Sequence, residues 1–411
     1  MKILFCINSL GGFGGLERVT IVKANALSAI PGNEVGICFS NKGSYPKTIH
    51  PLSPAVKVFF MDVSYWEYRN MSDVLIGFVP MILKMRKALI GIIDSFEPDV
   101  VVTTGTFEKY ALASLSITGI KGRISRLNRR GNMLLIREYH FNSGYRAFMT
   151  DSRIKLLGGE MVEWFENNIL SRFFDKTFLL TKADMEDHFK GRSKFDYMYN
   201  PSSFCPDVVS EYSTRPKVIL AVGRMTAEKN FKTLVEIWNR VSRKASGWKL
   251  RIVGDGKDMD DIRRLVRDFG IEKSVELPGK SDNVQKEMDS AQIYVMTSRN
   301  EGLPLVLLEA QALGVPIVSF DTPYGPAEIV RNGIDGLIVG YNDSGEFAGK
   351  LLELIDNDAL RQRMSAEALK RREEFTVERI IGKWMENYNR LLANKAPLKH
   401  TRITSLRRLL H

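Results

Sequence analysis

Two carboxylates stand eight positions apart in the segment EGLPLVLLE at 301–309, directly after the strand-like run QIYVMTS at 292–298. Glu301 falls in a Gly- and Pro-containing turn, and Glu309 falls on the helix expected to follow. A helix start offers free backbone N–H groups, which attract phosphate. Only the residues nearer Glu309 are expected to be firmly helical. Because Glu301 precedes the helix, both acids can border one ligand. Phosphate at the turn and hydroxyls at the acids predict a nucleotide-linked sugar.

Alternating strand-like and helix-like segments must position these acids. In the first half, the strand-like runs KILFCINS, EVGICFS and PDVVVTTG alternate with helical runs. The same alternation begins again in the second half at PKVILAVG. This pattern predicts an α/β protein with parallel sheets covered by helices on both faces. The segment YMYNPSSFCPDV at 197–208 interrupts both periodicities. We therefore expect two doubly wound, Rossmann-like domains, 1–203 and 204–375, that face a central cleft.

Two shorter elements follow the second domain. Residues 376–394 carry an apolar stripe at helical spacing, and we expect this helix to pack back on the first domain. Residues 395–411 are expected to form a basic amphipathic tail.

Residues at the carboxyl ends of the strands are the informative ones, because ligands of open α/β sheets bind there. Arg224 and Lys229 follow the strand-like run PKVILAV. Arg offers a planar fork of donors and Lys a compact charge, so the pair can clamp a diphosphate without a metal. A basic pair beside a surface turn is the alternative. Further donor-binding candidates at strand ends are Gly14, Gly15, Gly223, Gly254, Asp255 and Gly256.

An ordered set of motifs spans most of the chain. The set is GGLERV at 14–19, YNPSS at 199–203, GRMTAEKN at 223–230, GDG at 254–256, EGLPLVLLE at 301–309 and GPAEIVRNGIDGLIV at 325–339. In order and spacing it resembles the retaining glycosyltransferase family 4, of GT-B fold, of the type that builds bacterial surface polysaccharides or lipid-linked glycans.

The resemblance implies separate roles for the two acids. Glu309 would accept hydrogen bonds from the ribose hydroxyls, and Glu301 would contact hydroxyls of the transferred sugar, since a carboxylate is a good acceptor for vicinal hydroxyls. A solvated helix residue is the alternative for Glu309. The turn between them would face the diphosphate through the N–H groups of Gly302, Leu303 and Leu305, whereas Pro304 has none.

Three residues of the first half are further candidates for the site. His140, in LLIREYHFN, resembles the position where relatives place a basic residue or His near the donor sugar, and a structural histidine is the alternative. Arg137 could contact the donor or pair on the side of Glu138. Glu17 could reach the acceptor or favour the helix start through the helix dipole.

Two glycosidase-like carboxylates would act as nucleophile and acid, but we do not assign that pair here. With Glu309 on the ribose, it is far from the anomeric carbon. The family is thought to react on one face, with the leaving phosphate helping to deprotonate the acceptor. Catalysis then rests on positioning and charge stabilisation. Asp258-Met259-Asp260 has a metal-binding DxD form but opens a predicted helix. GGFGG is an incomplete dinucleotide fingerprint, so we expect neither metal nor cofactor.

The charge is unevenly distributed. The formal net charge is +11, residues 1–205 hold 26 Lys and Arg against 19 Asp and Glu, and the tail holds five bases and no acid. Basic clusters lie at 121–130, in the tail, and at 84–87 after the apolar run VLIGFVPMIL at 74–83. This pattern predicts an anionic membrane surface as a partner. Solvated loops and a frayed tail are the alternative, and no nucleic-acid-binding module is recognised.

The cysteines and apolar runs indicate the cellular setting. Cys6, Cys38 and Cys205 are scattered and lack metal-ligand spacing, so we expect reduced thiols in a cytoplasmic protein. The apolar start of the chain is short and ends in glycines, as in a buried strand rather than a signal peptide. The run at 74–83 is about half the roughly 20 residues of a membrane-spanning helix. We expect a peripheral protein on the inner face of the cytoplasmic membrane.

The leading hypothesis is a retaining, metal-independent transferase that moves a hexose from a nucleotide-diphosphate sugar, most simply a UDP-sugar. The acceptor would be a lipid-linked glycan in cell-surface polysaccharide synthesis. Two alternatives stay open, a nucleotide-sugar 2-epimerase of the same fold and a non-catalytic nucleotide-sugar-binding scaffold. The sequence leaves the sugar, the nucleotide, the acceptor, the linkage and the oligomeric state undetermined.

Overall fold

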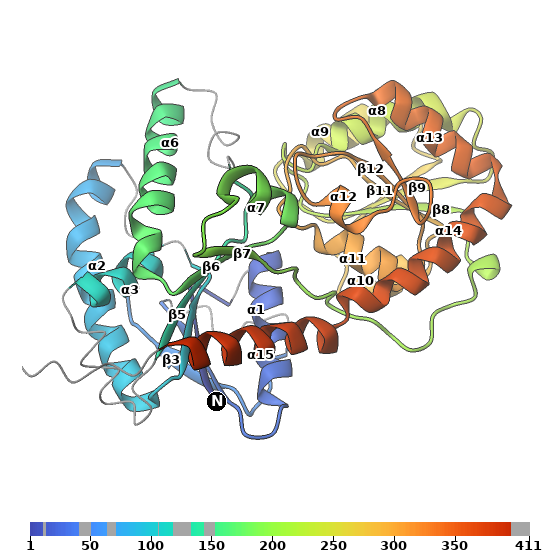
Figure 1. Ribbon diagram of the computed structural model, residues 1–411. Coiled ribbons are helices and arrows are strands. Elements are labelled where there is room, and N and C mark those ends of the chain that lie inside the picture. Colours follow the sequence, from blue (N-terminus) through green and yellow to red (C-terminus); the bar gives the residue numbers. More distant parts are fainter. Residues whose placement is uncertain are drawn as a thin grey trace, which may run out of the picture.

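The computed structural model describes residues 1–10, 14–40, 51–63, 71–105, 107–117, 133–143 and 153–395. Two α/β domains stand next to each other in Figure 1, the first on the left and the second on the right. Over these residues each domain is built on one sheet whose paired strands are parallel. The structure therefore confirms the predicted α/β class with two doubly wound domains.

The first sheet has the strand order β3-β2-β1-β4-β5-β6-β7 in the described part of the chain. Its strands wind outward from the boundary between β1 and β4, which is the switch point where such sheets bind ligands. The bounds are β1 Lys2–Ile7, β2 Glu34–Phe39, β3 Lys57–Phe60, β4 Val100–Thr103, β5 Leu134–Glu138, β6 Lys176–Leu179 and β7 Phe195–Tyr197.

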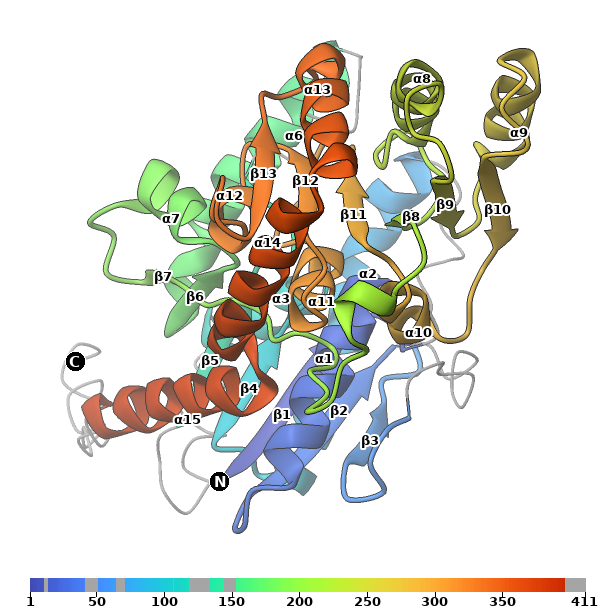
Figure 2. The ribbon, with the colours of Figure 1, turned by 90° about the vertical axis from the view of Figure 1, so that its right-hand side faces the viewer.

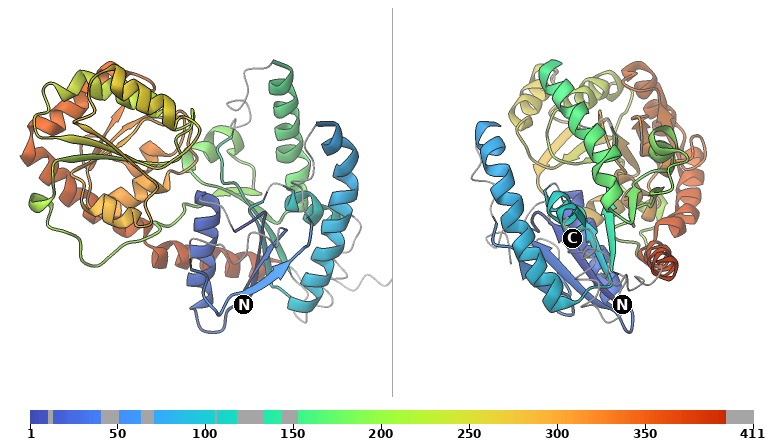
Figure 3. Two further views of the ribbon diagram at one scale, coloured as in Figure 1. Left: turned by 180° about the vertical axis from the view of Figure 1, so that it is seen from behind. Right: turned by 60° about the vertical axis from the view of Figure 1, so that its left-hand side comes forward.

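Helices cover both faces of this sheet, as Figure 3 shows from behind. Successive side chains of a strand point to opposite faces. In β1, Ile3 and Phe5 join the core formed with α1 and α15, whereas Leu4 and Cys6 join the core formed with α2 and α3. This explains why the strand is apolar without alternation. The helices are α1 Gly15–Ser28, α2 Met71–Phe96, α3 Glu108–Ile117, α6 Arg153–Asn168 and α7 Lys182–Phe189.

The second sheet has the order β10-β9-β8-β11-β12-β13, with its switch point between β8 and β11. Its strands are β8 Val218–Val222, β9 Lys249–Val253, β10 Val275–Gly279, β11 Ile293–Met296, β12 Ile317–Phe320 and β13 Gly336–Val339. Its helices are α8 Phe231–Ser242, α9 Met259–Asp268, α10 Val284–Asp289, α11 Leu305–Ala312, α12 Pro326–Ile329, α13 Ser344–Asp356 and α14 Asp358–Arg371.

The last described helix, α15 Val377–Asn394, returns to the first domain. Figure 2 shows α14 descending along the second domain before the chain turns into α15. The stripe of Ile380, Ile381, Trp384 and Tyr388 is buried in the same core as β1 and α1. Lys395 then donates to the backbone oxygen of Met133 at 2.7 Å. The first domain is thus completed by residues from the far end of the sequence.

No helix in the described ranges is both long enough and apolar enough to cross a lipid bilayer. The basic cluster at 121–130 and the tail beyond Lys395 lie outside the described residues.

Candidate functional site

The turns that follow β8 and β9 in the second domain are packed backbone against backbone. Met225 N donates to Asp255 O at 2.9 Å, and Gly223 N donates to Val253 O at 3.0 Å. Gly254 has a φ of +144°, and a Cβ on it would overlap the carbonyl oxygen of Gly223. Only glycine fits such an approach. A Cβ on Gly256 would likewise overlap the carbonyl oxygen of Met225, so the predicted donor-binding segment 254–256 has a structural reason for both of its glycines.

Lys229 and Glu301 form an ion pair at the ends of β8 and β11. Lys229 Nζ lies 2.6 Å from Glu301 Oε1, with side chains 20% and 10% exposed. The loops that carry them are joined because Arg299 N donates to Glu228 O at 2.8 Å. An ammonium and a carboxylate so placed can face the two ends of one ligand, a phosphate and a hydroxyl group.

Arg224 is much more exposed than this pair. Its side chain is 64% exposed, and its Nη2 is 3.8 Å from Glu228 Oε2. We predicted that Arg224 and Lys229 clamp one diphosphate together. The structure places Lys229 against Glu301 and leaves Arg224 facing solvent, where the guanidinium is accessible to an anionic ligand.

Glu309 is wholly buried, so it is not the solvated helix residue considered as an alternative. Arg18, from α1 of the first domain, holds its Nη2 2.6 Å from Glu309 Oε1. Burial raises the pKa of the Glu309 carboxyl, and the charge of Arg18 opposes that rise. Glu301 and Glu309 therefore have different cationic partners and different surroundings. Sequence reasoning assigned no role to Arg18, although it lies in the GGLERV motif.

The starts of α1 and α11 meet at the domain boundary. Gly14 is the residue before α1, Gly15 is its first residue, and a Cβ on Gly15 would lie 3.3 Å from the Leu305 side chain. Helix α11 begins at Leu305, with Pro304 preceding it. Backbone N–H groups at a helix start attract anions. The predicted diphosphate-facing residues 302–305 thus lie beside the Gly14-Gly15 turn.

The loop after β5 reaches the Glu301 loop from the other domain. Asn142 Nδ2 donates to Asn300 Oδ1 at 2.9 Å and to the backbone oxygen of Glu301 at 2.8 Å. A Cβ on Gly302 would lie 3.3 Å from the backbone oxygen of His140. Hence His140 and Glu301 belong to one interdomain site. Sequence reasoning missed Asn142, because a buried asparagine carries no motif of its own.

The His140 side chain is 5% exposed, and its Nε2 is 3.2 Å from Glu138 Oε2. This contact gives the ring a carboxylate partner, a common device for orienting a functional histidine.

The ion pair of Arg137 contradicts the alternative in which this residue pairs on the side of Glu138. Arg137 Nη2 pairs with Glu166 Oε2 of α6 at 2.7 Å, not with Glu138, because adjacent strand residues point to opposite faces. Lys109 Nζ lies 2.8 Å from the same Glu166 oxygen. Glu17 sits in the first turn of α1, and its carboxylate lies over Gly14. This position is favourable to the helix dipole.

Asp258 directly precedes α9, and Asp260 is an exposed residue of its first turn, 3.4 Å from Arg263. Among the residues that the structure describes, no group of three or more His, Cys, Asp or Glu side chains is arranged to hold a metal ion.

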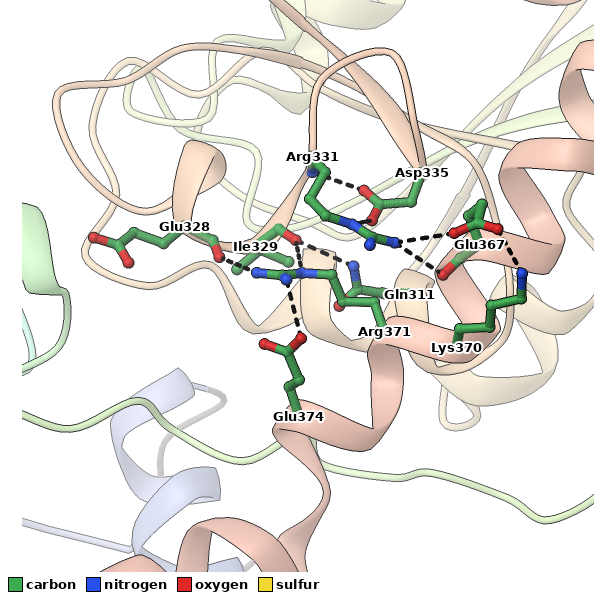
Figure 4. Close-up of polar contacts among 9 residues, drawn as sticks. All are labelled: Gln311, Glu328, Ile329, Arg331, Asp335, Glu367, Lys370, Arg371 and Glu374. Atoms are coloured by element: carbon green, nitrogen blue, oxygen red, sulfur yellow. Dashed lines mark hydrogen bonds and ion pairs between the residues drawn. The ribbon is translucent and has the colours of Figure 1, made fainter.

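The motif at 325–339 links the second domain to the first and also contacts the end of α14. The Glu328 carboxylate accepts from Ala183 N at 2.8 Å and from the Tyr199 hydroxyl, both in the first domain. Arg371, at the end of α14, donates to the backbone oxygens of Glu328 and Ile329 at 3.0 and 3.1 Å. Figure 4 shows the Arg371 contacts with the neighbouring Arg331, Asp335 and Glu367 contacts. Sequence reasoning noted the motif and missed its linking role.

Comparison with known proteins follows the same division of the chain. Residues 208–371 match the family model described as glycosyl transferases group 1. This match falls on the second domain and ends with helix α14. The amylovoran biosynthesis glycosyltransferase AmsD of Erwinia amylovora is 35% identical over 178 residues, 43% of this chain and 50% of that protein. The match thus spans half the length of that relative.

Two further likenesses extend beyond the group 1 domain. An uncharacterized glycosyltransferase of Haemophilus influenzae is 28% identical over 393 residues, covering 93% of this chain and 98% of the relative. The crystal structure of Anabaena HepE in complex with UDP and glucose superposes with a TM-score of 0.68 and 18% identity, covering 95% of this chain and 100% of that chain. The likeness confirms the predicted GT-B arrangement, and the group 1 domain and the relatives support the coarser prediction of a glycosyltransferase.

Proposed function

We propose that this protein is a retaining glycosyltransferase that moves a hexose from a UDP-sugar to a glycan acceptor. One observation carries the proposal. The Lys229–Glu301 pair, the start of α11, and the loop bearing His140 and Asn142 meet at the carboxyl ends of strands from both domains. That is where open α/β sheets bind nucleotides.

The reaction requires stabilisation of the leaving diphosphate, because negative charge accumulates on it as the sugar becomes cation-like. Lys229 and the N–H groups at the start of α11 supply positive charge at the boundary, and exposed Arg224 can close on the diphosphate from solvent. This cationic set performs the task without a metal ion. Glu301 then binds hydroxyl groups of the sugar.

The two acids do not form a catalytic dyad in this proposal. Glu309 is buried against Arg18 and Glu301 pairs with Lys229. A nucleophile and an acid would instead flank one bond. We therefore assign Glu309 to the ribose, which reaches the carboxylate once Arg18 moves aside. The configuration of the product, determined by NMR of its anomeric proton, tests retention independently of rate.

A membrane-associated acceptor fits the surface of the first domain. Val79 and Leu83 of α2 are exposed beside Lys84 and Lys87. Each basic residue near an anionic surface contributes about 1 kcal/mol. We propose peripheral attachment at the inner face of the cytoplasmic membrane, with a lipid-linked glycan as acceptor. Flotation with anionic vesicles checks this, and failure of both the full chain and residues 1–394 to float overturns the attachment.

A donor panel read by nucleotide release tests the activity itself. We expect one UDP-hexose to release UDP when membrane lipid extract is added as acceptor, with slow hydrolysis in its absence. Formation of an epimerised nucleotide sugar without acceptor would show that the protein is a nucleotide-sugar 2-epimerase instead. Tight UDP binding without turnover on any extract, with Glu301→Ala changing affinity only, would establish a binding scaffold.

A further inference from the structure

A chain of buried contacts leads from α1 through the end of β5 to His140. Lys23 Nζ lies 2.6 Å from Glu138 Oε1, and Glu138 Oε2 lies 3.2 Å from His140 Nε2. The side chains of Lys23 and Glu138 are 1% and 4% exposed. One carboxylate thus uses one oxygen for a buried ammonium and the other for the histidine at the site.

Helix α15 supports the far side of this chain. Lys23 Nζ stands 4.0 Å from the centre of the Trp384 ring, where a cation is attracted to the ring face. Tyr388, one turn further along α15, also faces Glu138, and burial together with the Glu138 charge raises the pKa of its hydroxyl. The titratable groups that we find facing Glu138 are therefore Lys23 of α1, His140 of its own loop and Tyr388 of α15.

Stability alone does not account for this ion pair. Burial lowers the pKa of Lys23, with Glu138 opposing that shift. Burial also acts to raise the pKa of Glu138, but Lys23 and His140 outweigh it and lower that pKa. Burial thus opposes the charged form of both groups. Replacing such a pair by apolar residues of similar volume is often neutral or stabilising. What the pair achieves is a fixed carboxylate aimed at His140.

We infer that Glu138 is a positioning residue for His140, held in place by Lys23 and backed by Trp384. Glu138 Oε2 accepts the Nε2–H of the ring, which fixes the tautomer and leaves Nδ1 as the nitrogen for the bound sugar or acceptor. The inference rests on the proposed function, in which His140 lies beside the donor. It gives α15 a part in the site, although no residue of α15 need touch a ligand.

The test compares two double variants that both remove the buried charges. Lys23→Met with Glu138→Met leaves an apolar pair and no acceptor for the ring. Lys23→Met with Glu138→Gln keeps an amide oxygen that can accept from Nε2. We expect the first to lower kcat roughly tenfold at unchanged donor KM, as loss of an orienting partner does. We expect the second to recover most of that loss. Equal kcat in the two variants would overturn the inference.

His140→Ala separates this inference from the proposed function. We expect it to be slow, and adding the Met pair (Lys23→Met with Glu138→Met) to it should lower kcat no further, because Glu138 acts only through His140 and residues acting as a unit are not additive. A wild-type rate for His140→Ala overturns the role of His140 and the positioning role together. A wild-type rate for the Met pair beside a slow His140→Ala overturns the positioning role alone.

A readout without turnover comes from the ring itself. In protein labelled with ¹⁵N-histidine, long-range ¹H–¹⁵N spectra should show His140 as the Nε2–H tautomer. In the variant with Lys23→Met and Glu138→Met, His140 should lose its preference for the Nε2–H tautomer. The denaturant midpoint of unfolding of this variant should stay at or above that of the wild type. An unchanged His140 signal in the folded Met pair contradicts the inference.

Discussion

The two domains hold their charged site residues in opposite ways. In the second domain, Arg224 and Lys229 follow strand β8 in a turn fixed by backbone hydrogen bonds, and both side chains keep some exposure. In the first domain, Lys23 and Glu138 are buried and fixed by contacts between α1, β5 and α15. Local backbone geometry thus positions Arg224 and Lys229, whereas tertiary packing positions the Glu138 carboxylate beside His140.

This difference predicts how substitutions in each domain should affect folding and turnover. A turn residue at the surface can be removed with little loss of folding, so its loss affects turnover. A buried residue shared by α15 and the first sheet affects folding and the site together. The predictions below test that contrast, beginning with the largest effect.

Trp384→Ala should destabilise the first domain most. Trp384 is 2% exposed and packs edge-on against Phe178 at 4.7 Å between ring centres. Removing a buried Trp costs about 3–5 kcal/mol. Denaturant unfolding should show an early transition of the first domain, separate from the second. The control Trp164→Ala, at an exposed ring of α6, should leave the curve unchanged, and equal curves for both variants would remove the contrast between the domains.

Lys229→Ala should have the largest effect on turnover. Losing one charge-stabilising donor in a transition state costs roughly 10²–10³ in kcat. The melting temperature should hardly change, since Lys229 lies in a partly exposed turn. Initial rates of UDP release measure the loss, with the exposed Lys244→Ala as matched control. Normal turnover of the Lys229 variant would disprove the phosphate assignment.

Glu309→Gln should weaken donor binding more than it slows turnover. A hydrogen bond to a charged group contributes about 1.5–3 kcal/mol, and the amide keeps only one acceptor oxygen for the ribose. Titration calorimetry with UDP measures the loss. Glu287→Gln, which alters a second-domain ion pair with Arg251, serves as control and should bind UDP as the wild type does. Equal affinities for all three proteins would place the ribose elsewhere.

Arg251→Met should give the smallest effect, and it should depend on pH. Hydrogen bonds from Arg251 lower the pKa of Glu287, with burial opposing the shift. A depressed folded-state pKa contributes stability above the unfolded pKa and loses it as the pH falls through the folded value. For a partly exposed pair we expect about 0.2–1 kcal/mol. The urea midpoints of the wild type and the variant should differ at pH 7 and converge as the pH falls below the folded-state pKa of Glu287, and a gap that widens in acid would contradict this account.

The sequence was informative where function depends on local order. Strand periodicity, prolines and strand-end glycines predicted the two sheets and the turns with Lys229 and Glu301, because each lies within a few residues of its strand. It could not predict the pairing of Arg18 with Glu309 or Arg137 with Glu166, which joins residues far apart in the chain. Such pairs depend on how helices dock, and periodicity carries no information about docking.

The path of α15 also has a consequence for the order of events during synthesis on the ribosome. Domains generally fold as units, the N-terminal one first, while the chain emerges. Here Ile380, Trp384 and Tyr388 belong to the core around β1, so the first domain cannot complete its core until α15 has been synthesised. Until α15 emerges, the nascent first domain keeps an uncovered apolar face, with Lys23 lacking its Trp384 partner. The second domain can close beforehand, so during synthesis the first domain exposes apolar surface for longer than the second.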